Sequence, residues 1–157
     1  MTTDDDLRRQ TLSIVSAYQA LISQKKFDEW IELWDEAGVC EFPYAPDGNV
    51  RRLEGRAAIY DYMTAYPGRF SIDSVERLRV HPMLDPQVAA VEVTIKGTAV
   101  ETGRPYNQSY VMFVEVGGGK IVQYREYWNP LITMDALGGM DAWLKPSRLP
   151  AAEAASE

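Results

Sequence analysis

The order of apolar and polar positions divides the chain into a helical first part and a strand-rich second part. Apolar residues recur every three or four positions in three segments, which predicts helices over about residues 5–24, 27–36 and 55–66. Pro67-Gly68 favours an end to the third helix at that point. The first helix carries one long apolar stripe, made of Leu7, Thr11, Ile14, Val15, Tyr18, Leu21 and Ile22.

Beyond residue 70 the pattern changes to the alternation that is typical of half-buried strands. Segments rich in Val, Ile, Tyr and Phe predict strands over residues 71–80, 88–100, 108–116 and 121–128, after an earlier strand at 39–44. The glycine-rich segment 117–120 between the last two is typical of a hairpin loop.

A last helix is expected over residues 131–144, interrupted at Gly138-Gly139. Helices first and long antiparallel strands afterwards predict an α+β domain over residues 1–144, with the helices on one face of a curved sheet. From Lys145 to residue 157, Pro, Ala, Ser and Glu dominate, and we expect a loose C-terminal tail.

Composition narrows the classes of partner. The 157 residues are 46% hydrophobic and 25% charged, as in ordinary globular proteins, and the net charge of −7 argues against nucleic acid or an anionic membrane. One cysteine and one histidine exclude the usual zinc sites, so no metal or cofactor is expected. The N-terminus lacks the pattern of a signal peptide and no apolar run would span a membrane, which makes the cytoplasm the expected location.

The segment from Gln123 to Pro130 carries the most chemical information. If it forms a strand, Tyr124, Glu126 and Trp128 share one face, because side chains alternate across a strand. A carboxylate between two large aromatic side chains would have a raised pKa if that face is buried, and would then be a candidate proton donor or acceptor. The alternative is a structural carboxylate that is hydrogen-bonded to a tyrosine or an arginine.

Four short motifs resemble the SnoaL-like proteins of the PhzA/PhzB type, members of the nuclear transport factor 2-like superfamily. They are EFPYAP at 41–46, LEGR at 53–56, TGRPY at 102–106 and REYWNP at 125–130. The resemblance covers roughly residues 7–144. It implies a cone in which three N-terminal helices pack on a curved, mostly antiparallel sheet and enclose a deep, mostly apolar pocket. Proteins with this fold catalyse many reactions or only bind ligands, so the fold alone does not set the reaction.

The resemblance also places candidate catalytic residues. Glu126 falls at the last-strand position where SnoaL-type cyclases carry a catalytic Asp and the PhzA/PhzB proteins a catalytic Glu. The PhzA/PhzB proteins add a His and a Ser one turn apart on the third helix, where this chain has Tyr62 and Tyr66. This difference argues against phenazine precursors as substrates and retains two hydroxyls one helical turn apart.

Steroid isomerases resemble the chain less. Their oxyanion-binding tyrosine on the first helix matches Tyr18, but their aspartate base falls at Phe42 and their second acid near Tyr110 or Val111. Both acids are missing, which argues against steroid isomerisation by that machinery.

We therefore expect Glu126 to transfer a proton, and Tyr18, Tyr62 and Tyr66 to orient the substrate or stabilise developing negative charge. Each tyrosine also has a structural interpretation, because an aromatic stripe on a helix more often belongs to the core. His81, at a strand end, and Arg104, near a turn, also have a structural interpretation, as a hydrogen-bonded loop-edge histidine and a solvated loop arginine. The residues expected to line the substrate pocket are Trp34, Phe42, Tyr44, Met63, Tyr124, Trp128, Tyr110, His81 and Arg104.

Together these residues predict a cofactor-independent acid–base enzyme, an isomerase, cyclase or lyase/dehydratase that acts on a small hydrophobic molecule, aromatic or carbonyl-bearing. One alternative is a non-catalytic small-molecule-binding protein of the same fold. An epoxide hydrolase is less favoured, because no inward Asp–Arg–Asp set is apparent. A homodimer is expected, since outward Val and Phe residues of the later strands would suit a sheet face covered by a second copy.

Overall fold

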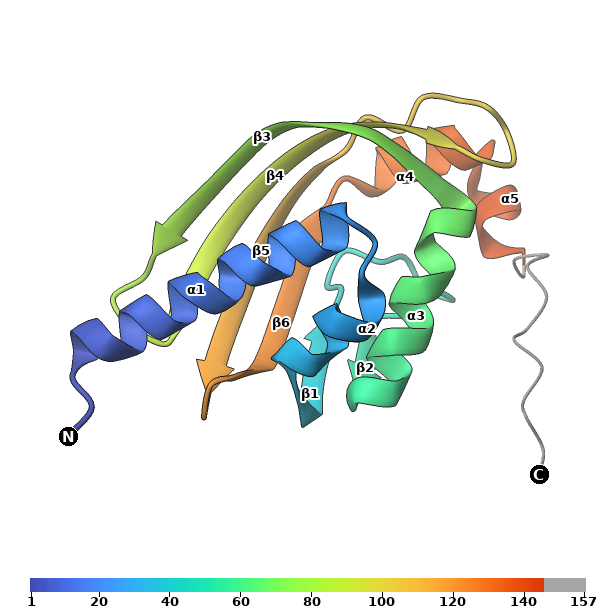
Figure 1. The fold of residues 1–157 in the computed structure, drawn as a ribbon. Helices are drawn as coiled ribbons and strands as arrows, with labels where there is room; N and C mark the ends of the chain where they lie inside the picture. The colour runs from blue at the N-terminus through green and yellow to red at the C-terminus, as the bar shows by residue number, and fades with distance from the viewer. Residues whose placement is uncertain (146–157) are drawn as a thin grey trace.

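A curved six-stranded sheet carries helices on its concave face in the computed structural model, which describes residues 1–145 (Figure 1). The strand order is β2-β1-β6-β5-β4-β3, and neighbours run antiparallel except for the parallel pair β1 and β6. The α+β prediction is therefore confirmed. The strands are β1 (Trp34–Glu41), β2 (Arg52–Glu54), β3 (Phe70–Pro82), β4 (Val88–Ala99), β5 (Ser109–Gly117) and β6 (Lys120–Trp128).

The helices occupy three places around the sheet. The long first helix runs across the concave face, the third stands near the short strands, and the last two lie together at one end of the sheet (Figure 1). Their bounds are α1 (Asp4–Ser23), α2 (Phe27–Trp30) with the 3₁₀ turn η1 (Ile31–Leu33), α3 (Arg56–Arg69), α4 (Pro130–Leu137) and α5 (Met140–Leu144). None of these helices is both long and apolar enough to cross a membrane.

The first helix forms as its sequence predicts. Thr3 and Asp6 cap its N-terminus reciprocally, each side chain accepting a hydrogen bond from the other residue's backbone N–H. The apolar stripe then turns Thr11, Val15 and Tyr18 into the core. Burial of this stripe holds α1 against the concave face of the sheet.

The two glycine signals are also confirmed. Gly118 and Gly119 both have positive φ, as a tight two-residue hairpin turn requires, and Gly117 pairs with Lys120 across it. Gly138 and Gly139 separate α4 from α5 with φ of 93° and 115°. The tail predicted after Lys145 lies outside the described residues.

The predicted second helix over residues 27–36 is too long. Helical geometry ends in the 3₁₀ turn after Trp30, and Trp34 already begins β1, where it pairs with Ile121 of β6. The strand expected at 39–44 correspondingly starts earlier and ends at Glu41. Trp34 is almost fully buried, and a buried apolar residue at this spacing fits a helix as well as a strand. The sequence therefore could not distinguish the two.

Two further boundaries differ from the sequence prediction. The third helix does not stop before Pro67 but continues through it to Arg69, where the Phe70 N–H closes the last turn by donating to the Tyr66 carbonyl. The strand β2 was not predicted at all. Its three residues are too few to show alternation, and it forms by pairing with β1, for example Leu53 with Cys40.

Gly97 allows the segment before β5 to approach β4 closely. A Cβ atom at this position would lie 2.6 Å from the Ser71 carbonyl oxygen and 3.1 Å from that of Tyr106. Both are backbone atoms, so relief requires movement of the chain. Gly97 therefore helps to set the position of Tyr106.

Replacing Gly97 by alanine should lower the free energy of unfolding by about 1–3 kcal/mol, because overpacking against backbone is relieved only by moving it. Urea unfolding measures this change. Gly117→Ala is the matched control, since its nearest neighbour is a Val122 methyl group at 3.3 Å that can shift. Equal unfolding midpoints for the two variants would contradict the close approach.

Candidate active site

Glu126 lies on the inner face of β6, opposite Met112 of β5, and is half-buried. The Tyr124 hydroxyl donates a hydrogen bond of 2.9 Å to the Glu126 Oε2 atom and also lies 3.0 Å from the sulfur of Met112. The inward orientation predicted from strand alternation is therefore what the structure has.

The Glu126 carboxyl is placed to exchange protons near neutral pH. Burial raises its pKa to about 7, and the hydrogen bond from Tyr124 opposes this rise because it favours the charged form. A carboxyl with this pKa is present in both its acid and its base form at physiological pH, as a proton-transfer group requires.

Aromatic rings form the floor beneath this carboxyl. The Tyr18 ring stacks on Tyr124 with a centroid separation of 5.4 Å, and the Trp30 ring meets Tyr18 edge-on at 5.6 Å. Trp34 packs against the other side of this group, 5.6 Å from the Tyr124 ring. Burial, and then the nearby charge of Glu126, raise the pKa of Tyr18 well above its usual range, so its hydroxyl stays protonated.

Helix α3 contributes a second wall. Tyr62 and Tyr66 are one turn apart and both half-buried, and the Tyr62 ring stacks on Phe42 at 5.0 Å. Burial raises the pKa of Tyr62, and Glu126 is the next cause, which places the Tyr62 hydroxyl within electrostatic reach of the carboxyl. The Tyr66 hydroxyl lies 2.8 Å from that of Tyr110 on β5.

Tyr106 completes a cluster that the sequence did not reveal. Its hydroxyl lies 2.7 Å from that of Tyr110, so Tyr66, Tyr106 and Tyr110 form one hydrogen-bonded group. Tyr106 follows a turn and precedes β5, and therefore no strand alternation marked it as inward-facing.

Gln108 anchors the segment that carries this tyrosine. Its amide is fully buried: the oxygen accepts from the backbone N–H groups of Ser109 and Asn129, and the nitrogen donates to the Asn129 carbonyl and, at 3.3 Å, to Thr133. The start of β5, the end of β6 and α4 are thereby tied together.

The remaining predicted wall residues divide into two groups. Trp128 lies on the inner face and packs at 5.8 Å against Trp143 of α5, and Met63 packs against the core. Both residues therefore belong, with those already described, to the aromatic and apolar core around Glu126.

Three predicted pocket residues lie elsewhere. Tyr44 comes after the end of β1 and is 59% exposed. His81 pairs at 2.7 Å with Glu92 on the exposed part of β3 and β4, and Arg104 donates to the Asp135 carbonyl of α4. The structure does not bring these side chains to Glu126.

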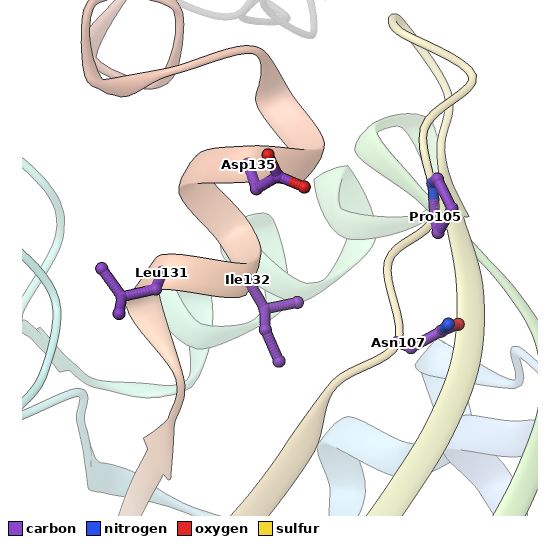
Figure 2. Close-up of a pocket in the computed structure, with 5 residues that line it drawn as sticks. All are labelled: Pro105, Asn107, Leu131, Ile132 and Asp135. Carbon is purple, nitrogen blue, oxygen red and sulfur yellow. The ribbon is translucent and has the colours of Figure 1, made fainter.

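The deep pocket implied by the family resemblance stays a prediction, because Glu126 lines neither of two hollows in the structure. One hollow, of about 300 Å³, lies between α4 and the segment before β5 (Figure 2). Leu131, Ile132 and Asp135 line it from the helix, and Pro105 and Asn107 line it from the segment before β5. A second, of about 390 Å³, lies around residues 25–29 and Tyr60.

Solvent nevertheless reaches several of the inward-facing residues. A half-buried side chain on an inner face keeps surface that a water molecule can touch. The half-buried inner residues are Tyr62, Met63, Tyr66, Tyr110, Glu126 and Trp128.

Over residues 1–145, no three His, Cys, Asp or Glu side chains are grouped to hold a metal ion.

Comparison with known proteins agrees with this architecture. The pattern of the SnoaL-like domain matches residues 15–124, which end two residues before Glu126. The protein YesE of Bacillus subtilis is 44% identical over 122 residues, covering 78% of this chain and 83% of YesE. The PhzA/B-like protein PA3332 of Pseudomonas aeruginosa is 35% identical over 116 residues, covering 74% of this chain and 82% of that protein.

A solved structure extends the match in three dimensions. A Bacillus subtilis protein whose name gives it as a candidate isomerase superimposes with a TM-score of 0.78 at 41% identity, over 84% of this chain and 95% of that one. The chain belongs to the SnoaL-like domain family, within the nuclear transport factor 2-like fold.

The raised pKa of Glu126 makes a signed prediction for stability. The folded protein holds the Glu126 proton up to about pH 7, whereas the unfolded chain releases it near the usual value of 4.5, so folded stability falls as pH rises between these values. A difference of this size corresponds to about 3 kcal/mol. Glu126→Gln removes the contribution and should be more stable than the unsubstituted protein at pH 8 by about that amount.

Urea unfolding at pH 4.5 and pH 8 measures the effect. The exposed outer-face variant Glu115→Gln serves as control, since it removes a carboxylate without removing a buried one. A Glu126→Gln protein that loses stability between these pH values as steeply as the Glu115→Gln protein would refute the raised pKa.

Proposed function

We propose that this protein is a cofactor-independent acid–base enzyme in which Glu126 transfers a proton on a small hydrophobic substrate. The observation that carries the proposal is a half-buried carboxyl of pKa about 7 that faces inward among tyrosine hydroxyls and aromatic rings. The structural alternative, a carboxylate hydrogen-bonded to a tyrosine, has the same contact, and the raised pKa of Glu126 is what favours the proton-transfer role. Among the described residues, Glu126 has only the neutral hydroxyl of Tyr124 as a hydrogen-bond partner.

The chemistry follows from the two protonation states. As a carboxylate, Glu126 takes a proton from a carbon beside a carbonyl, the electron pair of the broken C–H bond forms a C=C bond to the carbonyl carbon, and the π pair of the carbonyl moves to its oxygen. As a carboxylic acid, it returns the proton to another carbon or to a leaving oxygen. Isomerisation, cyclisation and elimination all use these steps, and none of them needs a redox group.

The surroundings favour an aromatic or carbonyl-bearing substrate. Trp128 and Met63 supply apolar contact area, and tyrosine hydroxyls, that of Tyr62 among them, are the polar groups that fix the orientation of the substrate. Tyr18 acts beneath Tyr124, where it holds that ring in place. The isomerase name given to the solved relative from Bacillus subtilis is consistent with this reaction class.

The test uses β-tetralone, a bicyclic ketone with acidic protons beside its carbonyl. In deuterium oxide the protein should catalyse exchange of these protons, followed by NMR, and Glu126→Gln should reduce the rate at least ~100-fold, the lower range for loss of a general base. Glu115→Gln should retain the full rate. A reduction of less than about tenfold in the Glu126→Gln protein would show that this carboxyl is not the base.

The same experiment distinguishes an enzyme from a binding protein. A non-catalytic member of the fold would bind β-tetralone, detectable by calorimetry, without accelerating exchange in either the unsubstituted protein or the variants.

We further propose a cytoplasmic homodimer formed through the convex face of the sheet. Val111, 38% exposed, and the half-buried Phe113 point outward from β5, where the Phe113 ring meets Tyr127 edge-on and lies under the Arg125 guanidinium at 5.5 Å. Aromatic and arginine side chains on an open sheet face are typical of protein interfaces. The single, buried Cys40 fits a reducing compartment.

Light scattering at micromolar concentration should give about twice the chain mass of 17.7 kDa. Val111→Arg should give the monomer mass, because it places a charge at the centre of the apolar contact. Val100→Arg, at a 54% exposed position just after the end of β4, should remain dimeric. A monomeric unsubstituted protein would overturn this proposal.

A further inference from the structure

The Tyr66, Tyr106 and Tyr110 hydroxyls form a polar group at some distance from the carboxyl. Tyr110 is central, 2.8 Å from Tyr66 and 2.7 Å from Tyr106. The three residues come from α3, from the segment before β5 and from β5 itself. Packing alone does not require three hydroxyls to meet in an otherwise aromatic interior, because buried polar groups are costly.

The number of hydroxyl protons in this cluster determines whether it can donate a hydrogen bond to a ligand. Three hydroxyls carry three protons, and the two hydrogen bonds between them use two. Tyr106 is only 3% exposed, with the Thr133 hydroxyl as its other neighbour, whereas Tyr66 and Tyr110 are half-buried. When Tyr66 and Tyr106 both donate to Tyr110, the Tyr110 proton remains available for an oxygen from outside the cluster.

This arrangement makes Tyr110 a strong neutral donor. Burial, followed by its tyrosine neighbours, raises the pKa of Tyr110 well above its usual range, so the hydroxyl keeps its proton at neutral pH. In the arrangement in which Tyr66 and Tyr106 both donate to Tyr110, these two hydrogen bonds polarise the Tyr110 O–H bond, and the apolar surroundings strengthen the resulting interaction. Such a donor stabilises a developing oxyanion without carrying a charge itself.

Strand register sets the distance from this donor to Glu126. Tyr110 is directly opposite Trp128 and Met112 directly opposite Glu126, so Tyr110 and Glu126 are diagonal neighbours on the inner face of adjacent antiparallel strands. Diagonal positions are about 7–8 Å apart along the sheet. A carboxyl and a hydroxyl at this spacing can contact opposite sides of one small ring.

We infer that the Tyr66–Tyr106–Tyr110 cluster is an oxygen-binding site that receives the carbonyl, enolate or phenol oxygen of the substrate while Glu126 acts on a carbon of the same ring system. Tyr110 donates to that oxygen, and Tyr66 and Tyr106 position and polarise Tyr110. In the proton transfer, the C–H bond breaks, the proton moves to a Glu126 oxygen, and the electron pair forms the enolate double bond. The enolate oxygen then accepts the Tyr110 hydrogen bond. This inference rests on the proposed function for its chemistry, but its binding test does not require turnover.

The probe is β-naphthol, which has the shape of the enol of β-tetralone, compared with β-methylnaphthalene, in which a methyl group replaces the hydroxyl. Fluorescence titration should show tighter binding of β-naphthol, although β-methylnaphthalene is the more hydrophobic molecule. Tyr110→Phe should weaken β-naphthol about tenfold to a hundredfold and leave β-methylnaphthalene within about twofold, because only the hydrogen bond is lost.

Tyr127→Phe provides the matched control. Its ring lies on the convex face, its hydroxyl makes no hydrogen bond within the described part of the chain, and both affinities should be unchanged. Equal affinity of the unsubstituted protein for the two probes, or no binding of either, would overturn the inference. So would a parallel loss of both probes in Tyr110→Phe, which would indicate a packing role only.

The two positioning residues have a separate spectroscopic test. The ultraviolet absorption of bound β-naphthol reports its ionisation, and Tyr66→Phe and Tyr106→Phe should each shift the pH midpoint of that ionisation upward by about one unit, a tenfold change in acidity. Unchanged midpoints in both variants would remove the polarising role of these two tyrosines.

Glu126→Gln separates this inference from the proposed function. The variant should keep its preference for β-naphthol while losing deuterium exchange. If exchange survives in Glu126→Gln but Tyr110→Phe still loses β-naphthol, the base assignment fails and the oxygen-binding site stands. If Glu126→Gln loses the preference as completely as Tyr110→Phe does, the hydroxyl of the probe binds at the carboxyl and the inference is overturned.

Discussion

The antiparallel register between β5 and β6 is the constraint on which the candidate site depends. It sets Met112 opposite Glu126 and Tyr110 opposite Trp128, so that the carboxyl and the central tyrosine share the concave face. A shift of β6 by one residue would turn Glu126 to the convex face and separate it from Tyr110. The tight turn at Gly118 and Gly119 joins these two strands and thereby helps to fix the register.

Around this register, the protein holds a carboxyl where a carboxylate is costly. Burial raises the pKa of Glu126, and only the Tyr124 hydroxyl opposes the rise. The cost is tolerated because Trp30, Trp34 and Tyr18 build a large, closely packed aromatic floor that stabilises the fold independently of Glu126. A local conflict of this kind within a well-packed core is typical of functional sites.

Elements with a strong period of their own were predictable, and elements made by partners were not. The α1 stripe, the alternation around Glu126 and the hairpin glycines each follow from local geometry. The start of β1 at Trp34 and the whole of β2 depend instead on pairing with other strands. Local spacing carries no information about such pairing, because the same apolar residues satisfy a helix and a strand.

The sequence by itself determined the α+β class, the family resemblance and the inward orientation of Glu126, since alternation and motif spacing are properties of neighbouring residues. Only the tertiary structure decided which hydroxyls meet. Tyr66 and Tyr110 are 44 residues apart, and Tyr106 joins them because Gly97 and Gln108 fix a segment that has no period. Tyr44, His81 and Arg104 lie apart for the same reason, because strand ends and turns are placed by long-range packing and not by local sequence.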